Sequence, residues 1–396
     1  MSLDSENHVY GRINGDDIIG LVDHIITQAI ESGVSDIHFE PIGKGLRVRY
    51  RVDGLLHEKE RFALEHSEQL IARIKIIAHI DVAERRIPQD GKYRMSYKDR
   101  CIDLRVSTFP TVYGEKVVIR ILDTAVSRKE LAELGFSETM LQTFSSVIHH
   151  NEGFVLVTGP TGSGKTTTLY SIISTLNVPH KHIVTIENPV EYSIDGIVQS
   201  QIHAAIGFTF KNSMKALVRQ DPDIIMVGEM RDKESACLAF EAALTGHFVL
   251  SSLHTKGAPD VLVRLIDMGV QSFMINAALT AVLAQRLLRR ICDACKKEQA
   301  LTDQEKLLCD QLHIMPSVSY RGTGCERCLY TGYKGRVGVF QLMIMSEEMR
   351  SLMMKQPTIE EMYQQAFRDG MESLMHDAVT KVLSGLISFN ELARLL

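Results

Sequence analysis

The spacing of hydrophobic positions in the first third of the chain predicts a small mixed domain. Apolar residues recur every three or four positions over residues 18–30, which predicts an amphipathic helix. Over residues 46–52 they alternate with arginines, and Asp53-Gly54 then predicts a hairpin to a second strand. A further helix is expected at about 65–80, and two more strands at 101–107 and 116–122. Residues 10–122 are therefore expected to form an α+β domain.

The pattern changes after a polar stretch at residues 123–130, which has the composition of a linker. From 131 to 287, short apolar strands are each followed by a helical segment, which indicates a mostly parallel α/β sheet buried on both faces. The strongest strand candidates are 154–158, 183–186, 224–227 and 248–251. Residues 288–338 hold five cysteines, four of them in two C-x-x-C motifs, and helices are expected over 339–396.

Composition narrows the class of protein. The 396 residues are 45% hydrophobic and 23% charged, which excludes a disordered or fibrous chain. The net charge of −5 gives no bulk attraction to nucleic acid or anionic lipid. No apolar run approaches the roughly 18 residues of a membrane span, and the polar start resembles no signal peptide. With an odd count of 7 cysteines, a reducing compartment is expected, hence a cytosolic multidomain protein.

Residues 159–166 match the phosphate-binding pattern G-x-x-x-x-G-K-[ST]. An apolar strand precedes the motif and a helical run follows it, so a glycine-rich turn without a ligand is disfavoured. Lys165 is expected to reach the β- and γ-phosphates of a nucleotide, and Thr166 to hold Mg²⁺. The predicted nucleotide-binding residues are Gly159, Pro160, Thr161, Gly162, Ser163, Gly164, Lys165, Thr166 and Thr167.

Three titratable residues follow predicted strands of the same sheet. Glu229 ends the strand at 224–227, where it could activate water or contact the metal through water. Glu187 ends another strand and could lie near Mg²⁺-bound water, although a solvated loop is an equal alternative. His254 ends a third strand and could sense the γ-phosphate, the alternative being a structural histidine.

Together these elements resemble the secretion ATPase family, which includes the type II secretion ATPases and the type IV pilus-assembly motors. GPTGSGKTTTLY resembles the family's Walker A motif, TIENPVEY its aspartate box, RQDPDIIMVGEMRD its Walker B motif and TGHFVLSSLHT its histidine box. SDIHFEP, AERRIPQDGK and DLRVSTFPTVYGEKVVIRIL extend the resemblance into the first third of the chain.

The resemblance implies a P-loop, RecA-like ATPase core, with the smaller α+β domain closing over the nucleotide. It implies a hexameric ATPase that uses ATP and Mg²⁺ and works at the cytoplasmic face of the inner membrane. Its partners would be further copies of itself and the platform proteins of a secretion or pilus system, with no nucleic acid. Which of the two systems it serves stays open.

The resemblance also implies that arginines of the smaller domain contact the phosphates. The matching positions are Arg105 and Arg120, and more weakly Arg86; a solvated or ion-paired sheet face is the alternative. The chain departs from the family where Asn188 follows Glu187 in place of an aspartate, which weakens a paired-acid metal site. Members of the secretion branch carry a further amino-terminal domain, and we expect a truncated chain or a short member of the family here.

Two C-x-x-C motifs predict a structural Zn²⁺ site. Four thiolates from two such motifs suit tetrahedral zinc, and the second motif disfavours a redox dithiol. The expected ligands are Cys292, Cys295, Cys325 and Cys328. The pilus-assembly and secretion branches of the family have such a site, so the insert agrees with the resemblance.

Three functions are weighed on these grounds. The first is an ATP-hydrolysing assembly motor. A nucleotide-gated scaffold with slow turnover is kept because of Asn188. A DNA-transfer translocase on the same fold is disfavoured by the net charge and by the lack of an aromatic and basic stripe.

Overall fold

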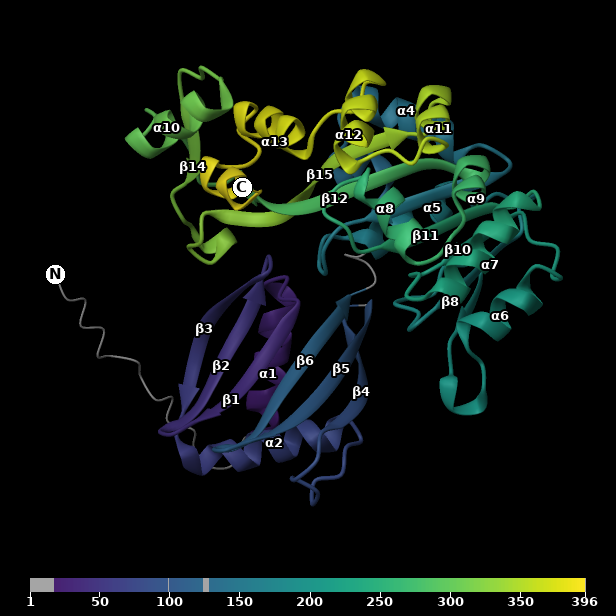
Figure 1. Ribbon diagram of the computed structural model, residues 1–396. Coiled ribbons are helices and arrows are strands. Elements are labelled where there is room, and N and C mark those ends of the chain that lie inside the picture. The colour runs from purple at the N-terminus through teal and green to yellow at the C-terminus, as the bar shows by residue number, and fades with distance from the viewer. Residues whose placement is uncertain (1–17, 99, 124–127, 396) are drawn as a thin grey trace. The chain divides into compact units, whose positions relative to one another are not determined.

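The structure is a computed structural model that describes residues 18–98, 100–123 and 128–395 (Figure 1). It divides between Ser127 and Arg128 into two compact units, here called the amino-terminal and carboxy-terminal units. Residues 10–17 of the expected first domain and residues 124–127 of the expected linker lie outside the described residues. Among the described helices, none has the length and apolar character needed to cross a bilayer.

The amino-terminal unit is a six-stranded sheet in the order β3-β2-β1-β6-β5-β4, with every neighbouring pair antiparallel. Two helices pack on one face of the sheet, and their apolar side chains form one core with the strands. The elements are α1 (Ile18–Glu31), β1 (Asp36–Ile42), β2 (Gly45–Val52), β3 (Leu55–Phe62), α2 (Leu64–Ile77), β4 (Gln89–Tyr97), β5 (Arg100–Thr111) and β6 (Gly114–Asp123).

Strand β2 shows how the sequence builds this sheet. Its buried Leu46, Val48 and Tyr50 face the helices, and the arginines between them are only half-buried on the other face. The turn to β3 uses Asp53 at φ 47° and Gly54 at φ 89°, the backbone that an Asp-Gly hairpin adopts. The predicted hairpin is therefore present.

The carboxy-terminal unit is a seven-stranded sheet in the order β15-β12-β7-β11-β10-β8-β9. Its neighbours from β12 to β9 are parallel, and β15 is antiparallel to β12. The sheet and its first helices are α4 (Glu138–Ile148), β7 (Gly153–Thr158), α5 (Lys165–Leu176), β8 (Ile183–Glu187), β9 (Val198–Gln201), α6 (Phe210–Leu217), β10 (Ile224–Val227), α7 (Lys233–Leu244), β11 (Phe248–Leu253), α8 (Asp260–Asp267) and α9 (Ser272–Ala278). Strands β7, β8, β10 and β11 match the four predicted strands, and each is buried at every position.

Two long strands lead to and from the cysteine segment, side by side in Figure 1. They are β12 (Leu279–Ile291) and β15 (Tyr333–Ile344). The expected divisions after residues 287 and 338 fall inside these strands, so the segment between them is shorter than expected. It contains β13 (Lys296–Gln299), α10 (Asp303–Leu312) and β14 (Ser319–Gly322). The expected helical end follows as α11 (Glu347–Met353), α12 (Ile359–Arg368), α13 (Leu374–Leu383) and α14 (Phe389–Leu392).

Candidate nucleotide site and tetracysteine cluster

The predicted phosphate-binding loop lies between the end of β7 and the start of α5, which begins at Lys165. Its three glycines, Gly159, Gly162 and Gly164, have φ values of 152°, 79° and 89°. L side chains rarely adopt these backbone angles, and a Cβ on Gly159 would lie 2.5 Å from the backbone oxygen of Gln285. The loop thus has the strand, glycine and helix-start context of a P-loop, with the positive end of a helix behind it.

The Lys165 ammonium lies within this loop. Its Nζ donates to the carbonyl oxygens of Gly159 at 2.9 Å and Pro160 at 3.1 Å, and it is 3.4 Å from Nδ1 of His254. Burial lowers the pKa of Lys165, and the nearby Glu229 carboxylate acts in the opposite direction. A cation partly withdrawn from water is suited to bind an anion.

Glu229 and His254 lie beside Lys165, as their positions after neighbouring parallel strands predict. The Nε2 of His254 is 3.6 Å from Oε2 of Glu229, so the histidine ring bridges the lysine and the carboxylate. Glu229 also pairs with Arg231, a partner that the sequence interpretation missed although it lies two residues further along the same motif. The Glu229 side chain is 25% exposed, so it can still meet a ligand.

Glu187 is the last residue of β8 and is deeply buried, at 3% exposure. Its carboxylate accepts hydrogen bonds from Tyr170 Oη, from Thr185 Oγ1 at 2.6 Å and from Gln199 Nε2 at 3.2 Å. Burial raises the pKa of Glu187, and these hydrogen bonds lower it in part. Both carboxylate oxygens therefore have protein donors, and a contact with Mg²⁺ stays a prediction.

A glutamine that the sequence interpretation missed braces the P-loop from β12. The Nε2 of Gln285 donates to the carbonyl oxygen of Ser163 at 2.6 Å, and its Oε1 accepts from Thr168 Oγ1 at 2.8 Å. The hydroxyl of Ser163 itself is buried and has no hydrogen-bond partner among the described residues. The available signal was an amide side chain at the end of the largely apolar run LTAVLAQ.

The predicted arginines lie in the amino-terminal unit. Arg105 on β5 and Arg120 on β6 are directly paired across the two strands, so both lie on the polar face of the sheet. The Nε of Arg120 is 2.9 Å from Asp36 Oδ1, and its side chain is 63% exposed. Arg86 is also exposed and pairs with Glu84. Carboxylate partners thus hold Arg120 and Arg86, as the ion-paired alternative expects, while their role toward phosphates stays a prediction.

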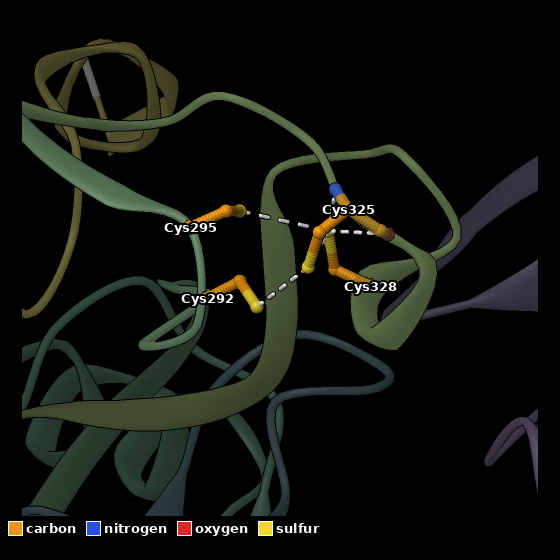
Figure 2. Close-up of side chains that lie close together, drawn as sticks. All are labelled: Cys292, Cys295, Cys325 and Cys328. Carbon is orange, nitrogen blue, oxygen red and sulfur yellow. Dashed lines mark hydrogen bonds between the residues drawn. The ribbon is translucent and has the colours of Figure 1, made fainter.

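The four predicted zinc ligands lie together in the carboxy-terminal unit, and Figure 2 shows their side chains converging from two loops. Their sulfur atoms all lie within 4.8 Å of one another. Three Sγ–Sγ distances are 3.9 Å (Cys292–Cys325), 3.8 Å (Cys295–Cys328) and 3.7 Å (Cys325–Cys328). Tetrahedral zinc with Zn–S bonds of about 2.3 Å requires about 3.8 Å between sulfurs, so the cluster fits this ion.

Comparison with known proteins agrees with both sites. A family model described as "Type II/IV secretion system protein" matches residues 14–394. The chain belongs to this family. Type II secretion system protein E of Pseudomonas aeruginosa is 43% identical over 377 residues, which are 95% of this chain and 75% of that protein. The type IV pilus assembly ATPase TfpB of Acinetobacter baylyi is 42% identical over 384 residues, 96% of this chain and 66% of that protein.

Members of the type II/IV secretion system family are secretion ATPases, and the chain is accordingly an ATP-hydrolysing enzyme. Its fold matches the Legionella pneumophila ATPase DotB, with a TM-score of 0.72, 22% identity and 95% coverage of both chains. The expected fold class, an α/β P-loop ATPase with a tetracysteine cluster and a helical end, is confirmed.

Proposed function

We propose that this ATPase is a hexameric motor that powers assembly of a type II secretion pseudopilus or a type IV pilus. The observation that carries the proposal is the convergence of Lys165, His254 and Glu229 at the P-loop. The relatives support it through their printed names, one a type II secretion protein and one a type IV pilus assembly ATPase.

Each residue of the site would have a separate role in the reaction. Backbone N–H groups of residues 161–164 would bind the phosphates, with Lys165 at the β- and γ-phosphates. Glu229 would orient the attacking water and accept its proton. His254 contacts both Lys165 and Glu229, so it would couple binding of the γ-phosphate at Lys165 to the position of Glu229. Thr166 and Thr167 complete the predicted binding set at the start of α5.

Two ions are proposed. The Thr166 hydroxyl is the group that would hold Mg²⁺, which neutralises charge on the β- and γ-phosphates. The four cysteines would hold Zn²⁺ with no ligand position left open, so that ion would be structural. The buried Ser163 hydroxyl, which has no hydrogen-bond partner in the described part of the chain, fits a loop that is completed by a ligand.

Arg105 and Arg120 would add positive charge at the γ-phosphate when the smaller domain closes over the nucleotide. We propose this domain as residues 10–122, linked through 123–130 to the ATPase core. The motor would lie at the cytoplasmic face of the inner membrane through its platform partners, and the net charge of −5 argues against nucleic acid.

A nucleotide-gated scaffold with slow turnover is the second candidate, and Asn188 is the observation that favours it. ATP hydrolysis measured against protein concentration separates the two, with Glu229→Gln as the variant and bound zinc counted on the same sample. For a motor we expect specific activity to rise with concentration, to vanish in Glu229→Gln, and zinc at about one per chain. If the chain bound nucleotide but did not hydrolyse ATP at any protein concentration, the nucleotide-gated scaffold would be the better assignment.

A further inference from the structure

The amide of Gln285 contacts the P-loop on both sides of Gly164. It donates to the Ser163 carbonyl oxygen, which precedes Gly164, and accepts from Thr168 on the first turn of α5. Gln285 is only 2% exposed and lies on β12, in the strand next to β7. The amide nitrogen and the amide oxygen of Gln285 therefore both form hydrogen bonds with the segment that the proposed function assigns to phosphate binding.

The hydrogen bond to Ser163 fixes the orientation of one peptide group. In a trans peptide the C=O and the following N–H point in opposite directions. A Ser163 carbonyl directed toward β12 therefore directs the Gly164 N–H away from β12. Gly164 has φ +89°, a region where glycine is free to rotate, so the local backbone does not set this orientation by itself.

The position of Gln285 is itself closely defined. Thr168 donates to its Oε1, which leaves the Nε2 end of the amide facing Ser163. The strand also approaches the loop through its backbone, because a Cβ on Gly159 would lie 2.5 Å from Gln285 O. A Cβ on Gly164 would lie 3.2 Å from Gln285 Nε2. The Gln285 side chain makes the hydrogen bonds to Thr168 and Ser163 in this one conformation.

We propose that Gln285 is a positioning residue of the nucleotide site, which holds the Ser163–Gly164 peptide so that the Gly164 N–H faces the polyphosphate of ATP. The inference rests on the proposed function, since it assumes that this loop binds ATP. Gln285 acts through the backbone of the loop and does not itself touch the nucleotide. Its removal should therefore weaken nucleotide binding more than it slows the chemical step.

The test compares two buried glutamines in neighbouring strands. Gln285→Leu removes both hydrogen bonds, whereas Gln341→Leu on β15 removes a bond from Ala258 N and leaves the P-loop contacts intact. Fluorescent ADP and a non-hydrolysable ATP analogue report affinity, and ATP turnover gives KM and kcat. For Gln285→Leu we expect affinity to weaken and KM to rise roughly 10-fold, with a smaller fall in kcat. Gln341→Leu should keep the wild-type affinity.

A milder variant decides the matter if Gln285→Leu does not fold. Thr168→Val removes only the hydroxyl that orients the glutamine amide, so we expect a few-fold loss of affinity that Thr168→Ser restores. Combined with a folded Gln285→Leu, Thr168→Val should cause no further loss, because the contact that it supports is already absent.

Three results would overturn the positioning role. They are wild-type affinity in folded Gln285→Leu, equal losses in Gln285→Leu and Gln341→Leu, or wild-type affinity in Thr168→Val. Each leaves the proposed function standing as long as the wild type binds and hydrolyses ATP. A wild-type chain that binds no nucleotide would overturn both.

Discussion

The parallel sheet of the carboxy-terminal unit and the antiparallel sheet of the amino-terminal unit carry their charged side chains in different places. Strands β8, β10 and β11 are buried on both faces, so their titratable residues lie only where the strands end, at Glu187, Glu229 and His254. Strands of the amino-terminal sheet are covered by helices on one face only. Their polar residues therefore extend along the whole of the other face.

On that face the charges satisfy one another. Glu40 on β1 pairs with Arg47 at 3.0 Å, Arg49 at 2.8 Å and Lys116 at 3.1 Å. Burial acts to raise the pKa of Glu40, but hydrogen bonds from these cations outweigh it and lower the pKa to about 2. Glu229 and His254 at the strand ends are exposed enough to meet a ligand, whereas most charges on the face stabilise the sheet. The two groups should respond differently to substitution.

A large effect, comparable with that of Glu229→Gln, is expected at Lys165. Lys165→Ala removes the cation of the P-loop, so ATP hydrolysis should fall by about 10³-fold with little change in the melting temperature. Turnover, nucleotide affinity and thermal unfolding are measured together, with Lys181→Ala as the control, a lysine of the same unit whose Nζ donates to Asn151 Oδ1 at 3.1 Å. If Lys165→Ala lowered the melting temperature but left nucleotide binding intact, the contrast between ligand-binding charges and sheet-stabilising charges would be wrong.

Arg120 tests the exception, because it lies on the polar face yet is proposed to reach the phosphates. Arg120→Ala should lower kcat by about 10²-fold, since its charge would stabilise the transition state. Arg94→Ala is the matched control, an arginine that is 71% exposed and bridges to Asp103 on the neighbouring strand. Equal kcat values in the two variants would place Arg120 with the purely structural charges.

Glu40 should affect stability and leave turnover unchanged. Because folding lowers its pKa, its contribution is complete above the unfolded pKa of about 4.5 and is lost as the pH falls toward about 2. Glu40→Gln should therefore cost about 2 kcal/mol at pH 7 and progressively less in acid. Urea unfolding across this pH range measures the difference, with Glu65→Gln, 78% exposed, as the control. A difference independent of pH would contradict this account.

Glu187→Gln should give the smallest effect, with kcat within a few-fold of wild type and a stability change below about 1 kcal/mol at pH 7. Folding raises the pKa of Glu187, so the wild type loses stability as the pH rises from the unfolded to the folded pKa. The variant should lack this loss in a comparison of unfolding against pH. A fall in kcat as large as in Glu229→Gln would instead place Glu187 at the metal or water, as the sequence hypothesis has it.

Local patterns made much of this molecule predictable. The P-loop, the four central strands and the cysteine pairs each depend on residues close in sequence, and the parallel strand order then brings His254 and Glu229 together. Strand β1 was not predicted, although Asp36, His38 and Glu40 alternate with Ile37 and Phe39 as in a strand with one polar face.

Contacts between segments that lie far apart in the chain could not be predicted from the sequence. Gln285 and Ser163 are 122 positions apart, and no local spacing encodes their hydrogen bond. The expected end of the ATPase core at residue 287 lies inside β12, where distant partners again decide the structure. The guanidinium of Arg289 on this strand stacks on Tyr333 and binds the fully buried Glu391. Tertiary partners that appear only after folding allow such a side chain to lie in a strand.

The length of β12 has a mechanical consequence. One strand carries Gln285 behind the P-loop and leads directly into Cys292 of the tetracysteine cluster, about 23 Å further along at roughly 3.3 Å per residue. An extended strand can lengthen very little, and pairing with β15 restricts its bending, with one shift of register between Arg289 and Ile291. A force applied at the tetracysteine cluster would therefore be transmitted along β12 to Gln285 and to the P-loop that this residue contacts.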